Sequence, residues 1–125
     1  MTVEEKVQAI LVGDATLIAS VPAARIKTPG QHQNLTLPYI VHFPVGVEPT
    51  YTHGGLAALR IWSYYQVSIF SDDYPTGRAV ADLVRDLLGN TRSPISCFWQ
   101  SMRTYSADNT ETQQFILEFR IAEAL

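Results

Sequence analysis

The chain has 125 residues, of which 46% are hydrophobic and 17% are charged, a composition that fits one globular domain over residues 1–125 and excludes a disordered or collagen-like chain. Nine basic and twelve acidic side chains give a net charge of -3, which argues against a protein that holds DNA mainly through phosphate contacts. The single cysteine, Cys97, excludes an internal disulfide framework and a cysteine-based zinc cluster.

No apolar run approaches the roughly 20 residues that are needed to cross a bilayer. The acidic start of the chain, with Glu4 and Glu5, is unlike the basic start of a signal peptide. We therefore expect a soluble domain with no membrane partner, made in a reducing cytoplasm.

The first predicted element is a helix over residues 2–12, whose apolar side chains share one face: Val3, Val7, Ile10 and Leu11. Thr2 and Glu5 have the spacing of a capping box, and Gly13 can close the helix. Asp14 then predicts the cap of a second, shorter helical turn that reaches about residue 20.

Several short extended segments follow. Residues 25–27 predict a short extended piece and residues 28–36 a polar loop. Tyr39–Phe43 predicts a short strand, because a proline at each end places the ladder between them or at a sheet edge. Residues 46–55 predict a second loop, which carries Tyr51 and His53.

The second half of the chain has the strongest periodic patterns. Residues 59–70 alternate as a strand rich in β-branched and aromatic side chains. A helix follows Ser71-Asp72-Asp73 and ends at Gly89-Asn90, with one apolar stripe: Val80, Leu83, Val84, Leu87 and Leu88. Residues 95–105 and 115–122 predict two more strands, joined by a turn near residues 107–109.

This order of elements predicts an α+β fold, an antiparallel sheet of about four strands with two main helices packed on one face. The aliphatic pairs assigned to the covered face are Val41 and Phe43, Ile61 and Val67, and Leu117 and Phe119.

The opposite face would then carry an unusual number of large apolar groups for a surface in water. They are Ile40, Trp62, Tyr64, Phe98, Met102 and Ile116, and their polar neighbours include Arg60, Gln66, Gln100, Glu118 and Arg120. Aromatic, Met and Arg side chains are enriched in protein interfaces, so we expect self-association or partner docking here, with Tyr51 and His53 contributing from the loop. Two other interpretations stay open: the surface folds under the long loops, or the strand register differs by one residue, which would exchange the faces.

Signatures of catalysis and of metal binding are missing from the sequence. The three histidines, His32, His42 and His53, have no HxH or HExxH spacing. Asp72 and Asp73 precede a helix and are explained as caps, while Cys97 has no neighbouring base in the sequence. No phosphate-binding glycine loop and no GxSxG elbow occurs. We expect no catalytic residue, no metal and no cofactor.

The order of the segments resembles a known family. The segments are "AARIKT" at 23–28, "LPYIVHFPVG" at 37–46, "LRIWSYYQVSIFS" at 59–71, "AVADLVRDLL" at 79–88 and "FILEFRIAE" at 115–123. Over nearly the whole chain this is similar to the small tail completion proteins (tail terminators, head-tail joining proteins) of long-tailed bacteriophages and prophages.

The resemblance implies a structural virion assembly protein and no enzyme. It implies a homo-oligomeric ring, commonly six-fold, at the head-proximal end of the tail, which ends tube growth, joins the tail to the head connector and leaves a channel for the genome. The implied partners are other copies of the chain, the tail tube protein and the head connector proteins, with no sequence-specific nucleic acid. The implied location is the virion tail, and the host bacterial cytoplasm during assembly.

The alternative that the residues leave open is a small ligand-binding or enzymatic α+β domain of unknown substrate. Its pocket would be lined by Tyr39, Tyr65, Tyr105 and His42. Such a pocket would be concave and half apolar, and would hold at least one group with a shifted pKa.

Overall fold

A computed structural model describes residues 2–29, 36–51, 58–92, 95–106 and 112–124, with side chains described at all of these except 49–51, 58–61, 106 and 124. The elements in chain order are helices α1 (Val3–Val12) and α2 (Ala15–Ser20), strands β1 (Ile26–Lys27), β2 (Tyr39–Tyr51) and β3 (Ala58–Ser71), helix α3 (Tyr74–Gly89), and strands β4 (Ser96–Ser106) and β5 (Gln113–Ala124). A single 3-10 turn, Ala23–Arg25, leads into β1.

The helix starts are confirmed, and each has the cap that its sequence predicts. The Thr2 side chain accepts from the Glu5 amide, Asp14 accepts from the Leu17 amide, and Asp73 accepts from the Thr76 amide. Each of these bonds satisfies a backbone donor that the first helical turn leaves unpaired. The polar residues before each apolar stripe therefore define where the helices begin.

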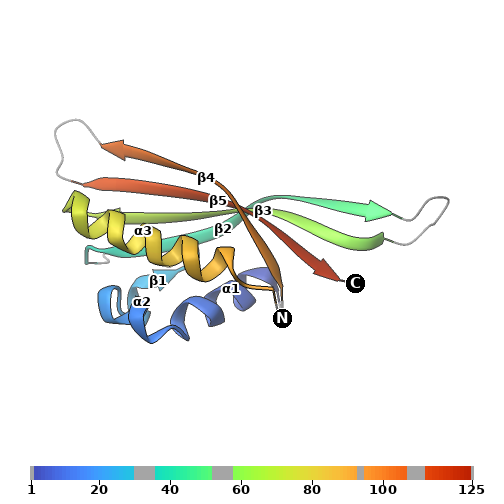
Figure 1. The fold of residues 1–125 in the computed structure, drawn as a ribbon, viewed down its shortest axis with the longest axis horizontal. Coiled ribbons are helices and arrows are strands. Elements are labelled where there is room, and N and C mark those ends of the chain that lie inside the picture. The colour runs from blue at the N-terminus through green and yellow to red at the C-terminus, as the bar shows by residue number, and fades with distance from the viewer. Residues whose placement is uncertain (1, 30–35, 52–57, 93–94, 107–111, 125) are drawn as a thin grey trace.

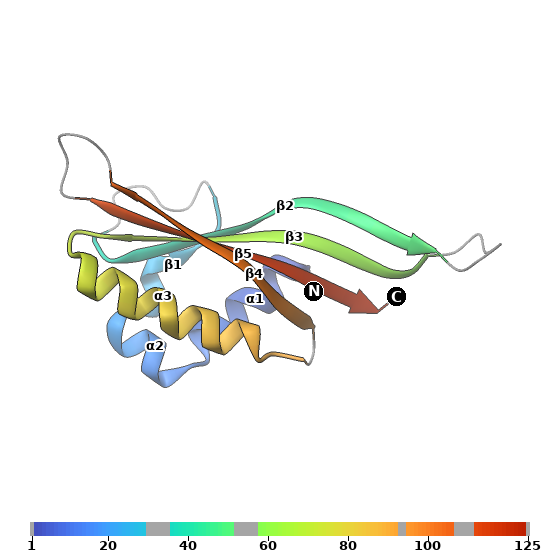
Figure 2. The same ribbon diagram turned by 45° about the horizontal axis from the view of Figure 1, so that its top comes forward.

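The sheet has five strands in the order β1-β2-β3-β5-β4, where about four were predicted. The additional strand is β1, which pairs in parallel with β2 at Ile40 and Val41, while the other pairs are antiparallel. The predicted α+β class and the short extended piece at residues 25–27 are confirmed. Figure 2 shows all three helices on one side of the sheet and none on the other.

The predicted short strand between two prolines is wrong in length, because β2 continues through Pro44 and Pro49 to Tyr51. Within the described residues β1 covers only the start of β2, so the remainder of β2 lies at the sheet edge, where a proline breaks no ladder. A register shift between Pro44 and Gly46 accommodates the first proline. Part of the predicted loop at 46–55 is therefore strand, and its residues 52–55 lie outside the described chain.

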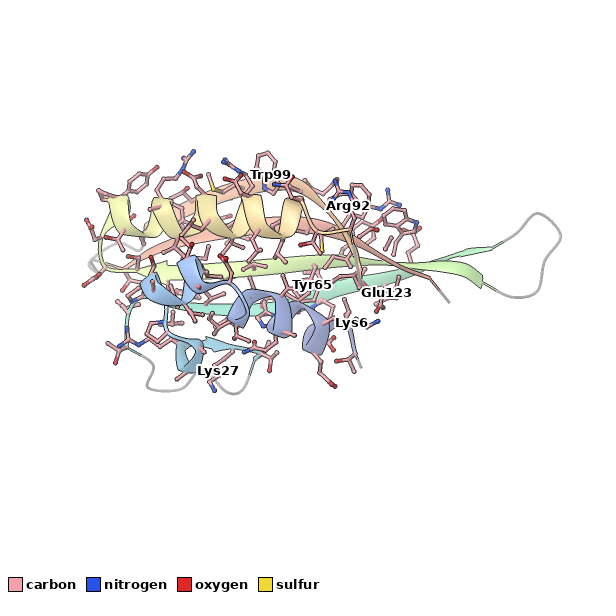
Figure 3. All side chains as sticks on the ribbon, turned by 60° about the horizontal axis from the view of Figure 1, so that its bottom comes forward. Lys6, Lys27, Tyr65, Arg92, Trp99 and Glu123 are labelled. Carbon is pink, nitrogen blue, oxygen red and sulfur yellow. The ribbon has the colours of Figure 1, made fainter. Side chains whose placement is uncertain are left out.

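The long β2–β3 hairpin projects beyond the helix layer (Figure 1). We call its distal part, residues 46–51 and 58–63, the hairpin arm. The helix layer itself is connected to the sheet by a 2.8 Å ion pair between Lys6 of α1 and Glu123 of β5 (Figure 3). Val47 of the arm is 62% exposed, which fits a position that the helices do not cover.

The core lies between the helices and one sheet face. On β3 and β5 its largest fully buried side chains are Tyr65, Ile69, Phe115, Leu117, Phe119 and Ile121. Gly77 brings α3 close to the sheet, because a Cβ atom there would lie 2.5 Å from Cε2 of Phe115. The alternation predicted for residues 115–122 therefore places its aromatic and aliphatic set on the covered side.

Candidate interaction surface on the open face of the sheet

Parts of two strands place their side chains on faces opposite to those predicted. Ile40 is fully buried against the helices, whereas Val41 and Phe43 lie on the uncovered side, so the register of residues 39–43 is shifted by one. Met102 packs against the core instead of facing outward. The reason at Met102 is a register shift between Trp99 and Ser101, where one extra residue reverses the alternation.

The other predicted interface residues with described side chains share the uncovered side, which we call the open face. Strand register aligns Tyr64 with Arg120 and Arg120 with Phe98, so these three lie in one row across β3, β5 and β4. Trp62 lies in the next row, opposite Ala122. Ile116 lies on the same face of β5 but is 8% exposed. For Arg60 and Tyr51 only the backbone is described, and His53 lies outside the described residues.

An aromatic and arginine cluster forms the centre of this face. The Arg120 guanidinium carbon lies 4.1 Å from the ring centroid of Trp62 and 5.8 Å from that of Tyr64. The Trp62 and Phe98 rings are 6.1 Å apart, and Arg92 lies 4.7 Å from the Phe98 ring. We call these five residues the open-face cluster. They were predicted from the alternation, apart from Arg92, which reaches the cluster from the loop after α3.

The cluster is accessible from outside. Tyr64 is 43% exposed and Phe98 is 38% exposed, so neither ring is covered by its own molecule in the described chain. The Tyr64 hydroxyl donates to Glu48 over 2.7 Å, and this hydrogen bond raises the pKa of Tyr64 above its usual value. Exposed aromatic rings beside arginine on one sheet face have the composition of a protein interface.

Two shallow grooves of about 360 Å³ each run along the same face. One is lined by Pro29, Val41, Phe43, Gln66, Ser68, Phe70 and Gln114, and the other by Val45, Tyr64, Tyr65, Gln66, Gln100, Arg103, Glu118 and Phe119. Both contain Gln66, so they meet at the middle of β3. The open face is therefore a continuous, half-apolar surface rather than a single deep cleft.

The pocket residues proposed for a ligand-binding domain do not lie together. Tyr65 and His42 are buried in the core, whereas Tyr39 stacks on Phe70 and Tyr105 is 50% exposed, both on the open face. The four side chains therefore line no common cavity.

His42 and Tyr65 instead belong to a buried polar chain between the sheet and α1. The Tyr65 hydroxyl donates to Nδ1 of His42 over 2.6 Å, and Nε2 of His42 donates to Oε1 of Gln8 over 2.6 Å. Gln8 in turn donates to the carbonyl of Ile26. Burial lowers the pKa of His42 to about 4 and raises the pKa of Tyr65 above its usual value. These hydrogen bonds join β3, β2, α1 and β1, so the role of the four residues is structural.

The remaining chemical candidates are also in structural positions. Cys97 is fully buried, and burial raises the pKa of its thiol to about 12. Asp73 caps α3, as described above. Within the described ranges, no group of three or more His, Cys, Asp or Glu side chains is arranged to hold a metal ion. None of the described helices is long and apolar enough to cross a membrane.

Comparisons with known proteins agree with this architecture. The family model described as "Tail completion protein gp17" matches residues 5–124. A chain of a solved structure, "Virion of native gene transfer agent (GTA) particle", has the same fold with a TM-score of 0.76 and 21% identity, over 95% of this chain and 92% of that chain. No curated protein matches the chain. Because the family model covers nearly the whole sequence, the protein belongs to the tail completion protein family of bacteriophages.

Proposed function

We propose that this tail completion protein closes into a homo-oligomeric ring at the head-proximal end of a phage tail, where it ends tube growth and joins the tail to the head connector. Membership of the family gives the chain a structural role in phage tail assembly, which argues against an enzyme. Beyond this structural role, we propose the ring itself, contacts with the tail tube protein and the head connector proteins, and assembly in the host bacterial cytoplasm.

The observation that carries the proposal is the open face of the sheet. Three helices cover the other face, while Tyr64 and Phe98 remain more than a third exposed beside Arg120. A cyclic head-to-tail ring needs two different surfaces on each subunit. The open face can supply one of them, and the α1 side of the helix layer or the hairpin arm can supply the other.

The sharpest test replaces an aromatic side chain of the open-face cluster by a charged one. We expect Trp62→Glu or Tyr64→Glu to abolish concentration-dependent association in sedimentation experiments. Association would bury the new carboxylate in the interface, which costs free energy when the charge is unpaired. The matched control is Thr16→Glu, at an exposed position of α2. Circular dichroism and the unfolding midpoint would verify that each variant still folds.

The proposal would be abandoned if the unchanged protein stayed monomeric at high concentration and also in the presence of purified tail tubes. Association that the glutamate variants leave unchanged would place the ring interface away from the open face.

A further inference from the structure

The guanidinium of Arg120 is held in place by rings rather than by carboxylates. It lies over Trp62 at 4.1 Å and near Tyr64 at 5.8 Å, and its Nε atom is buried with no hydrogen-bond acceptor among the described residues. Arginine is the cation best suited to such stacking, because its planar group is more weakly hydrated than an ammonium. The side chain is therefore pre-oriented, and none of the contacts that orient it supplies a negative charge.

Three other arginines of the described chain have acidic partners, while Arg92 of the open-face cluster donates to the backbone carbonyls of Gly89, Thr91 and Cys97. Arg103, on the same open face, pairs with Glu118, and on α3 Arg78 and Arg85 pair with Asp82. No carboxylate of a described residue lies within ion-pair distance of Arg120. Arginine beside exposed aromatic rings is also the composition of an interface hot spot. The Arg120 guanidinium is therefore available to a carboxylate from outside the subunit.

The opposite side of the same molecule offers suitable carboxylates. A groove of about 600 Å³ runs between α1 and the end of β1, lined by Thr2, Glu4, Glu5, Gln8, Ala9, Lys27 and Thr28. Figure 3 views this side, with Lys27 at the β1 edge. Glu4 is half-buried and Glu5 is exposed, and neither forms an ion pair with a described residue. The groove is acidic where the open-face cluster is basic.

We propose that the open-face cluster of one copy docks in the α1 groove of the next copy, with Arg120 facing Glu4 and Glu5. This inference rests on the proposed ring and names the two surfaces that would close it. The surfaces are different, so the contact is heterologous and can repeat around a ring. Charge complementarity would fix the orientation of the subunits, and the aromatic rings would supply the buried apolar area.

A nucleic-acid strand is the competing occupant, because aromatic rings and arginines on a sheet face can also stack bases. The observations favour protein. Arg103 on the same face is already paired with Glu118, so this cation is not available to a phosphate backbone. The net charge of -3 acts in the same direction.

The test is disulfide trapping between two versions of the full chain. Gln100→Cys places a thiol on the open face beside the cluster, and Ala9→Cys places one in the groove. Cys97 is fully buried and its thiol has a raised pKa, so it does not compete under mild oxidation. When the two versions are mixed, we expect a mixed disulfide. The matched control pairs Ala9→Cys with Tyr105→Cys, an exposed position at the other end of the open face.

Charge reversal then identifies the contact. Arg120→Glu in the Gln100→Cys version is expected to lower the yield of mixed disulfide by roughly tenfold or more, as for other close interfacial charge pairs. Glu4→Arg together with Glu5→Arg in the Ala9→Cys version should restore it. Equal trapping at Tyr105→Cys, or a yield that charge reversal does not change, would overturn the inference.

Other outcomes separate this inference from the ring proposal. Association in sedimentation without the mixed disulfide would overturn the inference and leave the ring standing. No association with or without tail tubes would overturn both. Retention of DNA that Arg120→Glu abolishes, with trapping unchanged, would assign the cluster to nucleic acid instead.

Discussion

The two faces of the sheet are built from the same strands but differ in how deeply they bury their side chains. On the side toward the helices, Phe115, Leu117 and Phe119 of β5 are at most 1% exposed. On the other side, the alternate residues Glu118 and Arg120 are half-buried. Glu118 forms an ion pair with Arg103, and Arg120 lies over the ring of Trp62. The covered face therefore carries the stability of the fold, whereas the open face keeps large side chains whose burial within the monomer is incomplete.

The largest expected effect comes from removing a side chain of the covered face. Phe119→Ala should lower the free energy of unfolding by about 3–5 kcal/mol, because it leaves a cavity in a close-packed core. The matched variant on the open face, Phe98→Ala, should cost less than about 1.5 kcal/mol, because that ring is already 38% exposed. Urea unfolding of both variants measures the difference, and equal losses would contradict the contrast between the faces.

The buried polar chain should make stability depend on pH. The pKa of His42 is about 4 in the folded protein and 6.5 in the unfolded chain, so the unfolded chain binds the proton more readily. Stability from this group is complete above pH 6.5 and is lost as the pH falls toward 4, by about 3 kcal/mol.

The control for this prediction is His42→Gln, which removes the titrating group. Subtracting its stability profile from that of the unchanged protein cancels the carboxylates that both proteins share. A flat difference between pH 6.5 and 4 would show that His42 does not titrate as described.

A smaller effect should follow from filling the close approach between α3 and the sheet. Gly77→Ala places a Cβ atom 2.5 Å from Phe115 and 3.0 Å from Ser71, so one element must shift. We expect a loss of about 1–3 kcal/mol in the free energy of unfolding. Gly89→Ala, in the same helix, meets Trp99 at an ordinary 3.8 Å and should be neutral or stabilising by up to about 1 kcal/mol. Thermal unfolding of the pair tests this, and a larger loss at Gly89 would contradict it.

The smallest effect is expected for an exposed ion pair on the open face. Arg103→Ala removes the contact with Glu118, and both side chains are at least 40% exposed. The expected loss is about 0.2–1 kcal/mol, and it should shrink as salt screens the charges. Unfolding in low and in high salt measures this. A loss that salt does not change would mean that Arg103 acts through packing instead.

Most of the local structure was predictable from the sequence. The capped helix starts follow from Thr2, Asp14 and Asp73, because each supplies an acceptor for an unpaired backbone donor. The alternation in β5 predicts which of its side chains are covered. Four of the proposed interface residues, Trp62, Tyr64, Phe98 and Arg120, are gathered on one face for the same reason, and their role as an interface remains a prediction.

The wrong face assignments arose where a shift of one residue decides which side of the sheet a side chain faces. Ile40 and Met102 were assigned to the open face, but both contribute to the covered side. Side chains alternate with a period of two, so a shift of one residue at Tyr39–Phe43 or a bulge near Gln100 moves every later side chain to the other face. Arg92 was missed because it lies outside the predicted strands, where no alternation assigns a side chain to a face.

The sequence by itself determined the class of fold, the helix limits and the family, because these depend on local periodicity, on capping groups and on the order of segments. Only the tertiary structure decided the fifth strand, the continuation of β2 through two prolines and the placement of Arg120 over the ring of Trp62. Each of these depends on which neighbour a strand or side chain meets across the sheet. Such contacts join residues far apart in the sequence, and no local pattern records them.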